Sequence, residues 1–220
     1  MREKYNFITV EGNTGAGKTT LAQMLAEQYK GNLILEDFVD NPFLPKFYID
    51  RERYAFPCEL HFLMARQKQL SEIIASNKLK QGFNISDYLL NKSLLYGQVN
   101  LEGDEYQLYA NIFNALYPKL PKPELVVYVH STVPRLIKNI QKRGRGFEQD
   151  VDPNYLQKVE ELYMEYFKSN PQLKVLIIHA DNLDFVAHPE HYQQILEWVN
   201  KDYEGGITDL YLNEEVRKEK

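Results

Sequence analysis

The sequence predicts an α/β fold in which a five-stranded parallel sheet is flanked by helices. Two observations predict this fold. Five short apolar runs alternate with longer segments in which apolar residues recur at intervals of three and four. A glycine-rich stretch that ends in Gly-Lys-Thr directly follows the first run, where a strand would turn into a helix. Strands separated by helices imply right-handed crossovers, and therefore parallel strands.

The predicted strands are short and rich in Val, Ile and Leu, as is typical of strands that are buried on both faces of a sheet. They occupy residues 7–10, 33–35, 83–86, 125–129 and 175–178. The predicted helices lie between and after them, because apolar residues with helical spacing form one face for packing on the sheet. They occupy residues 19–29, 58–77, 105–117, 133–142, 154–168 and 190–200.

A length of 220 residues is enough for one domain with a substantial core. We predict that this domain spans residues 1–202. Residues 203–220 contain the pair Gly205-Gly206 and end in a run of mainly charged residues, so we predict a polar C-terminal tail there.

Composition excludes several classes of protein. Hydrophobic residues make up 44% and charged residues 26% of the chain, which argues against disorder. The single cysteine, Cys58, excludes an internal disulfide framework, and a net charge of −5 argues against general binding to nucleic acid. We see neither a signal peptide nor an apolar run of the roughly 18 residues that a membrane span requires. We therefore expect a cytoplasmic protein with small-molecule ligands.

The most specific motif matches the phosphate-binding loop, or P-loop, G-x-x-x-x-G-K-[ST]. Its backbone N–H groups would turn around phosphate oxygens, Lys18 would reach the outer phosphates, and the hydroxyl of Thr19 would bind Mg²⁺. The alternative is a glycine-rich turn without a ligand. The candidate ATP-binding residues are Gly12, Asn13, Thr14, Gly15, Ala16, Gly17, Lys18, Thr19 and Thr20.

Glu36 follows the second predicted strand. It therefore lies at the carboxyl ends of the strands, where the ligands of open α/β sheets bind. A carboxylate there can accept a proton from an attacking hydroxyl. The alternative is an acidic turn in solvent. The sequence contains no N-K-x-D guanine signature, which argues against a GTPase.

Further motifs follow in a fixed order. They are Glu36, residues 41–48, residues 53–56 with Glu59 and Arg66, Ser86-Asp87, residues 142–148 and residues 181–185. This combination resembles the deoxynucleoside kinase family over nearly the whole chain, and particularly its bacterial branch for purine deoxynucleosides. The resemblance implies a P-loop NTPase fold of the nucleoside-monophosphate-kinase type, ATP as phosphoryl donor, Mg²⁺, and a homodimer formed through helices 58–77 and 105–117.

The resemblance also implies roles at the nucleoside site. Glu36 would be the general base for the 5′-hydroxyl, and Tyr48 and Glu148 would hold the 3′-hydroxyl. Phe56 would line the base pocket, although plain core packing explains an aromatic residue equally well. Glu59 and Arg66 lie seven residues apart on one predicted helix and would face the base, unless they form a surface ion pair.

Two positions depart from the family pattern. The family commonly has an amide where Glu59 stands, and a carboxylate there is compatible with adenine and with guanine. The family also commonly has Arg-Ser after the acid of the third strand, whereas Asp87 is followed by Tyr-Leu. We expect Asp87 to orient Mg²⁺ or the 5′ end of the nucleoside, and Lys92 to replace the missing positive charge. Ser93 stands where relatives have a base-reading acid.

Arg143 and Arg145 lie in a basic, glycine-containing segment that would form a lid over ATP and stabilise charge on the transferring phosphoryl group. A basic helix end with a glycine cap is the alternative. After the last predicted strand, Asp181, Leu183 and Phe185 would lie around the adenine of ATP, as the resemblance implies.

The resulting hypothesis is an enzyme of nucleotide salvage. It transfers the γ-phosphoryl group of ATP to the 5′-hydroxyl of a purine 2′-deoxynucleoside, and deoxyadenosine is the preferred substrate. The alternatives are deoxyguanosine or a broader substrate range, a P-loop kinase with a phosphorylated or shikimate-like acceptor, and a nucleotide-binding regulatory protein without turnover.

Overall fold

The computed structural model describes residues 4–36, 41–75, 82–117 and 122–212. A six-stranded, entirely parallel sheet forms its centre, with strand order β2-β3-β1-β4-β5-β6. The strands are β1 (Phe7–Gly12), β2 (Asn32–Ile34), β3 (Asn84–Ser86), β4 (Leu125–His130), β5 (Lys174–His179) and β6 (Gly206–Leu210). The predicted parallel α/β sheet is therefore confirmed, but the predicted count of five strands is wrong.

The additional strand is β6, which forms in residues that were predicted to be a polar tail. It pairs with β5 and is the edge strand of the sheet. Only Thr208 and Leu210 are buried in it, so its composition stays polar and hides the strand from sequence inspection. Gly206 has a φ of 104°, and a Cβ on Gly205 would lie 2.5 Å from the carbonyl oxygen of Pro171. The glycine pair is thus needed where the chain enters the sheet. Residues 213–220 lie outside the described residues.

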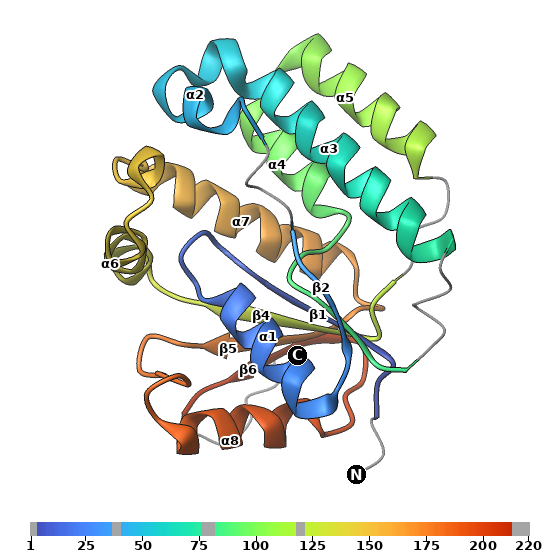
Figure 1. The fold of residues 1–220 in the computed structure, drawn as a ribbon, viewed down its shortest axis with the longest axis vertical. Helices are drawn as coiled ribbons and strands as arrows, with labels where there is room; N and C mark the ends of the chain where they lie inside the picture. Colours follow the sequence, from blue (N-terminus) through green and yellow to red (C-terminus); the bar gives the residue numbers. More distant parts are fainter. Residues whose placement is uncertain (1–3, 37–40, 76–81, 118–121, 213–220) are drawn as a thin grey trace.

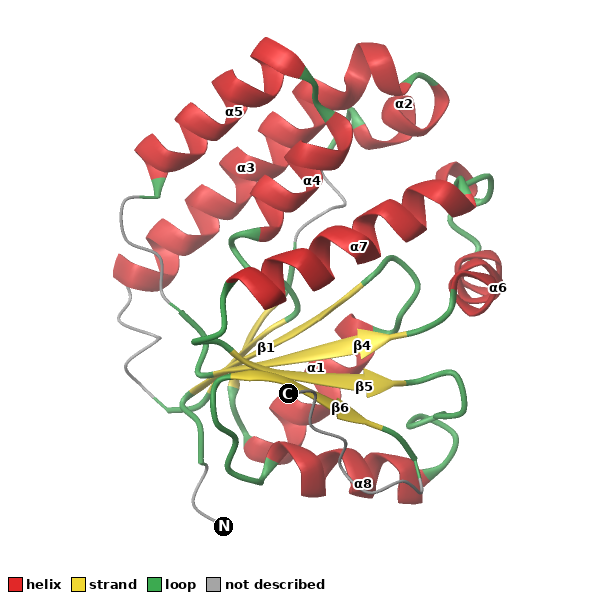
Figure 2. Ribbon diagram, turned by 180° about the vertical axis from the view of Figure 1, so that it is seen from behind, coloured by secondary structure: helices red, strands yellow, loops and turns green. Residues whose placement is uncertain are grey.

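Helices cover both faces of the sheet (Figure 1; Figure 2). One face carries α1 (Lys18–Tyr29) and α8 (Pro189–Val199), and the opposite face carries α7 (Pro153–Ser169). Aromatic side chains join α7 to the sheet, because the ring of Tyr128 on β4 lies 5.2 Å from that of Tyr163 and 5.5 Å from that of Phe167. All three side chains are buried in the core. This packing fixes α7 along that face of the sheet.

A helical layer packs on the far side of α7 (Figure 1). It consists of α3 (Arg51–Ala75), α4 (Lys92–Asn100) and α5 (Gly103–Leu116), with α2 (Leu44–Ile49) at one end. The predicted helix 58–77 thus begins earlier, since α3 continues through Pro57, and α2 and α4 were not predicted at all. None of the helices in the described part of the chain combines the length and apolar composition needed to cross a bilayer.

Candidate active site

The P-loop lies between β1 and α1, as predicted. Gly15 and Gly17 have φ angles of 86° and 90°, which favour glycine. A Cβ on Gly15 would lie 2.9 Å from the carbonyl oxygen of Leu136 in α6 (Val133–Arg143), and Asn139 of α6 donates a 2.9 Å hydrogen bond to the Gly15 carbonyl. Because α6 packs this closely, Gly15 is needed for space as well as for its conformation.

Asn13 anchors the P-loop to α7. Its Nδ2 donates to the carbonyl oxygen of Leu156 at 2.7 Å, and its Oδ1 accepts from the backbone N–H of Thr14 at 2.9 Å. Asn13 is buried, so both ends of its amide are satisfied within the protein. The side chain therefore shapes the loop, and its amide is not directed at a phosphate.

Asp87 connects the P-loop to Glu36. Its Oδ2 accepts a 2.6 Å hydrogen bond from the hydroxyl of Thr19, and its Oδ1 accepts a 2.7 Å bond from the backbone N–H of Glu36. Asp87 follows β3, and β3 lies between β1 and β2 in the sheet, so the carboxyl ends of three adjacent strands meet at this side chain. A hydroxyl and a carboxylate are also oxygen ligands of the kind that Mg²⁺ prefers.

The carboxylate of Glu36 is held between two buried cations. Arg66 donates to Oε1, with Nε at 3.0 Å, and Nζ of Lys92 lies 2.8 Å from Oε2. Burial alone would raise the pKa of Glu36, but Lys92 and Arg66 hold that pKa well below its ordinary range. Glu36 is therefore ionised at neutral pH.

Lys92 begins α4, a helix that the sequence did not predict. Its side chain is 5% exposed, and its ammonium group faces Glu36. Lys18 of the P-loop is also close to this cluster. Burial lowers the pKa of Lys18 to about 8, and the charge of Lys92 contributes to the decrease. Two lysines and Arg66 thus gather positive charge around one carboxylate.

These groups line a cavity of about 110 Å³. Its lining combines P-loop residues, charged side chains and aromatic rings. The lining residues are Thr14, Lys18, Thr19, Glu36, Leu44, Phe47, Tyr48, Cys58, Glu59, Phe62, Arg66, Asp87, Lys92, Tyr96, Arg143, Arg145, Glu148 and Tyr155. Most of the predicted substrate residues are therefore brought together. Phe56 is an exception, because it packs against the core and Phe62 of the same helix lines the cavity.

The lid segment meets the sugar residues at one end of this cavity. Glu148 ends the 3₁₀ turn η2 (Gly146–Glu148) and is buried, and both Arg143 and Arg145 donate to its carboxylate. Tyr48 lines the same end, where burial and the charge of Glu148 raise the pKa of its hydroxyl above the ordinary value. Tyr48 therefore stays protonated and can donate a hydrogen bond.

Glu59 and Arg66 share the expected face of α3 but make separate contacts. Arg66 turns to Glu36 and also donates to the hydroxyl of Ser93 at 2.6 Å. Ser93 is buried behind Arg66 and does not line the cavity. Glu59 instead accepts a 2.7 Å hydrogen bond from Nδ2 of Asn100, a residue that the sequence did not indicate.

The segment after β5 lies beside the P-loop and outside the cavity lining. A Cβ on Gly17 would lie 3.3 Å from the ring of Phe185, and Phe185 and Leu183 are both buried. Asp181 accepts hydrogen bonds from the backbone N–H and the hydroxyl of Thr132, at 3.0 and 2.9 Å. Its carboxylate therefore connects this segment to the start of α6.

The family follows from comparison with known proteins. The protein-family model described as deoxynucleoside kinase matches residues 8–203. The chain belongs to the deoxynucleoside kinase family. It is therefore an ATP-dependent deoxynucleoside kinase, as the resemblance in its sequence predicted, and the regulatory alternative without turnover is set aside.

Individual relatives of this kinase differ in the base that their names state. A deoxyguanosine kinase of Bacillus subtilis (strain 168) is 35% identical over 200 residues, covering 89% of this chain and 96% of the relative. A deoxyadenosine kinase of Lactobacillus acidophilus is 27% identical over 208 residues, covering 88% and 94%. A structure of deoxyadenosine kinase from M. mycoides with dCMP and dCDP has a TM-score of 0.76 at 24% identity, covering 88% and 98%, and shares the fold.

Sequence reasoning missed Glu11, a carboxylate at the end of β1. Glu11 is fully buried and accepts hydrogen bonds from the backbone N–H of Leu89 at 2.6 Å, the backbone N–H of Gly12 at 3.1 Å and the hydroxyl of Tyr163 at 2.8 Å. It therefore joins the P-loop, α7 and the segment that follows Asp87. A charged residue directly after an apolar strand was the available signal.

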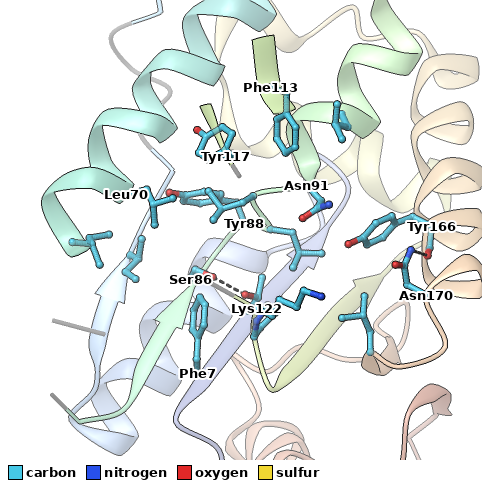
Figure 3. A pocket seen from close by; sticks show the side chains of 18 of the residues that line it. Phe7, Leu70, Ser86, Tyr88, Asn91, Phe113, Tyr117, Lys122, Tyr166 and Asn170 are labelled. Carbon is cyan, nitrogen blue, oxygen red and sulfur yellow. Dashed lines mark hydrogen bonds between the residues drawn. The ribbon is translucent and has the colours of Figure 1, made fainter. Parts of the chain in front are cut away.

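A second cavity, of about 340 Å³, adjoins the kinase site (Figure 3). Asp87 and Lys92 line the first cavity, whereas residues 88–91 between them line the second. The rings of Tyr88 and Phe113 gather there (Figure 3), and no Asp or Glu is among its described lining residues. It therefore lacks the acidic and phosphate-binding groups that phosphoryl transfer requires, so the charged cavity is the candidate active site.

Proposed function

We propose that this kinase phosphorylates the 5′-hydroxyl of a purine 2′-deoxynucleoside in the charged cavity, with Glu36 as general base. One observation carries the proposal: Asp87 accepts hydrogen bonds from Thr19 of the P-loop and from the backbone of Glu36. A phosphoryl donor bound to the P-loop and a hydroxyl group bound beside Glu36 would therefore lie close together, because the side chain of Asp87 contacts both places. Such positioning is a major part of catalysis of phosphoryl transfer.

In the proposed reaction, the 5′-oxygen forms a bond to the γ-phosphorus of ATP as the bond to the β–γ bridging oxygen breaks. The 5′-hydroxyl proton passes to Glu36, and ADP leaves. The low pKa of Glu36 keeps its carboxylate in the ionised form that accepts a proton. Lys18 and Lys92 lie around the same carboxylate and would stabilise negative charge on the transferring group.

The remaining contacts with ATP are proposed from where the residues lie relative to the P-loop. Residues 12–20 would hold the phosphates, and the oxygens of Thr19 and Asp87 would hold Mg²⁺, which neutralises phosphate charge when bound. Arg143 and Arg145 would contact the phosphates from the lid, and residues 181–185 would face the adenine. The buried contact of Phe185 with the P-loop supports that last assignment.

The nucleoside would occupy the remaining part of the cavity. Tyr48 and Glu148 line one end and are proposed to hold the 3′-hydroxyl, while Glu59 is proposed to contact the base. The aromatic walls Phe62 and Tyr155 suit a flat base. Deoxyadenosine is expected from the sequence, and deoxyguanosine is named for the 35% identical relative; a carboxyl group at position 59 can form hydrogen bonds with either base.

Substitution Glu36→Gln tests the proposed base. Steady-state phosphorylation of the four deoxynucleosides and their ribose counterparts should show purine deoxynucleosides preferred by wild type and a loss of roughly 10²- to 10⁴-fold in kcat for the variant. Equilibrium dialysis should show that the variant still binds the nucleoside. The matched control is Glu161→Gln, on the exposed surface of α7. Wild-type turnover in a correctly folded Glu36→Gln variant would remove Glu36 from the mechanism.

A cytoplasmic homodimer formed through α3 and α5 remains a proposal. Met64 on α3 and Leu108 on α5 are 48% and 52% exposed, and large apolar side chains at such exposure are suited to a subunit interface. These helices lie in the layer farthest from the sheet (Figure 1). Sedimentation equilibrium should give about twice the mass of the chain.

A further inference from the structure

Glu59 is held in the nucleoside cavity by one of its two carboxylate oxygens. Its side chain extends from α3, is 3% exposed and lines the cavity. Oε1 accepts the hydrogen bond from Asn100 at the end of α4, and no described residue donates to Oε2. Oε2 is therefore the atom with which Glu59 can bind a molecule in the cavity.

The surroundings of Glu59 allow it to exchange a proton near neutral pH. Burial raises its pKa to about 7, while Arg66 and the hydrogen bond from Asn100 oppose the increase. The titratable and charged groups that face it come from four helices and the segment after β2. They are Cys58 and Arg66 of α3, Lys92 and Tyr96 of α4, Tyr109 of α5, Tyr155 of α7, and Glu36.

Asn100 determines which oxygen carries the proton. Because Nδ2 of Asn100 donates to Oε1, a proton on the neutral carboxyl group is placed on Oε2. Oε2 is then a donor in the neutral form and an acceptor in the ionised form. Oε1 keeps a second lone pair and is an acceptor in both forms.

The two forms differ in the purines that they match. Guanine has two adjacent donors, N1–H and the N2 amino group, which suit the two acceptors of the ionised carboxylate, and its acceptor O6 beside N1–H also suits the neutral carboxyl group. Adenine has a donor, the N6 amino group, beside the acceptor N1, which suits only the acceptor and donor of the neutral carboxyl group. We propose that the protonation state of Glu59 controls the selection of the base: the ionised form prefers deoxyguanosine, and the neutral form binds both purine deoxynucleosides.

This inference rests on the proposed function and adds a specificity switch to it. In the ionised form, the acceptor N1 of adenine lies opposite a second acceptor, which reduces binding by roughly 10- to 100-fold. Arg66 does not provide the same discrimination, because Glu36 and Ser93 already occupy its guanidinium group. The selection therefore depends on Oε2 of Glu59.

The test is the ratio of kcat/KM for deoxyguanosine to kcat/KM for deoxyadenosine, measured from pH 6 to pH 8 at saturating ATP. Titration of Lys18, Glu36 and ATP affects both reactions alike and cancels in the ratio. If only the neutral form accepts adenine well, the ratio should rise with pH through the pKa of Glu59, by about 5- to 10-fold over the range. A ratio that changes less than threefold overturns the inference.

Two variants test whether Glu59, and not another titrating group, causes the pH dependence of the ratio. Glu59→Gln has both a donor and an acceptor at every pH and can pair with either purine, so its ratio should be independent of pH. Asn100→Ala removes a hydrogen bond that lowers the pKa of Glu59, so the whole curve should move to higher pH. A purely structural role of Asn100 would not move it. Glu165→Gln, on the exposed face of α7, is the control and should keep the wild-type curve.

The possible failures are distinguishable. Wild type that phosphorylates neither nucleoside contradicts the proposed function, whereas turnover with a flat ratio contradicts only the switch. A pH-dependent ratio in Glu59→Gln also overturns the switch, since another group must then titrate. Should that variant not fold, equilibrium dialysis of both nucleosides with wild type at pH 6 and pH 8 gives the same test, and the preference for deoxyguanosine should be larger at pH 8.

Discussion

Replacing Lys92 with methionine removes a buried charge while keeping a side chain of similar length. Nζ of Lys92 lies 2.8 Å from Oε2 of Glu36, and the two side chains are 5% and 13% exposed. At that distance two unit charges attract by about 6 kcal/mol at an effective dielectric constant of about 20, and desolvation offsets much of this energy. The pair is therefore strongly coupled, although its net contribution is smaller than the Coulomb term.

Breaking a buried pair by removing one partner typically costs about 3–5 kcal/mol. Arg66 still neutralises Glu36 in Lys92→Met, so we expect the lower end, about 3 kcal/mol of unfolding free energy, or about 6–12 °C in Tm for a chain of this size. Urea denaturation at neutral pH measures the loss. Lys158→Met, on the exposed surface of α7, should change stability by about 0.5 kcal/mol or less.

A double-mutant cycle isolates the pair. The double variant Glu36→Gln/Lys92→Met lacks both charges of the pair, so neither one is left buried without the other. Its loss of unfolding free energy should therefore be smaller than the sum of the losses in the single variants, with a coupling energy of about 2–3 kcal/mol. We also expect kcat of Lys92→Met to fall roughly 10²-fold, because one cation beside the proposed reaction site is lost. Additive stabilities would refute the structural pairing, and an unchanged kcat would refute its proposed role in transfer.

Two further predictions concern the P-loop and pH. Gly15→Ala should destabilise the protein by about 2–4 kcal/mol and raise the KM for ATP, because a Cβ there would lie 2.9 Å from the carbonyl oxygen of Leu136 at a φ of 86°. Gly144→Ala, at a φ of 74° with no atom within 4 Å, should cost only about 1–2 kcal/mol in chemical denaturation, and equal losses would contradict the steric argument. The hydrogen bond that His130 donates to Glu160 raises the pKa of His130, so wild type should be more stable than Glu160→Gln below about pH 6.5, and this advantage should disappear as pH rises above the pKa of folded His130. Urea denaturation from pH 5.5 to pH 8.5 measures the difference, and a constant advantage would exclude the His130 pair as its source.

Local patterns in the sequence predicted the parallel sheet, most of the helices and the P-loop. These features depend on residues close together along the chain: an apolar run forms a buried strand, and the spacing of three and four forms an amphipathic helix. The glycines of the P-loop are likewise required by the backbone of the loop itself. The sequence also predicted site roles for Glu36, from its place after a strand, and for Asp87, Tyr48 and Glu148, from a family resemblance, and all four line the charged cavity.

The strand β6 shows where such patterns fail. An edge strand has one neighbour and little burial, so a polar composition is compatible with it, and only its pairing with β5 reveals it. Phe56 and Phe62 show a second limit. Both are aromatic residues of α3, and only the packing of that helix decides which of them lines the cavity.

The sequence alone determined that this chain forms a P-loop α/β fold with a carboxylate at the edge of its sheet, because those features are encoded in short segments. Only the tertiary structure decided that Lys92 pairs with Glu36, 56 residues away, and that Asn100 holds Glu59, 41 residues away. Both partners come from α4, whose position depends on its packing against α3 and α7. The chemistry of each carboxylate depends on such distant neighbours, since burial and adjacent charges, and not the residue type, set its proton affinity.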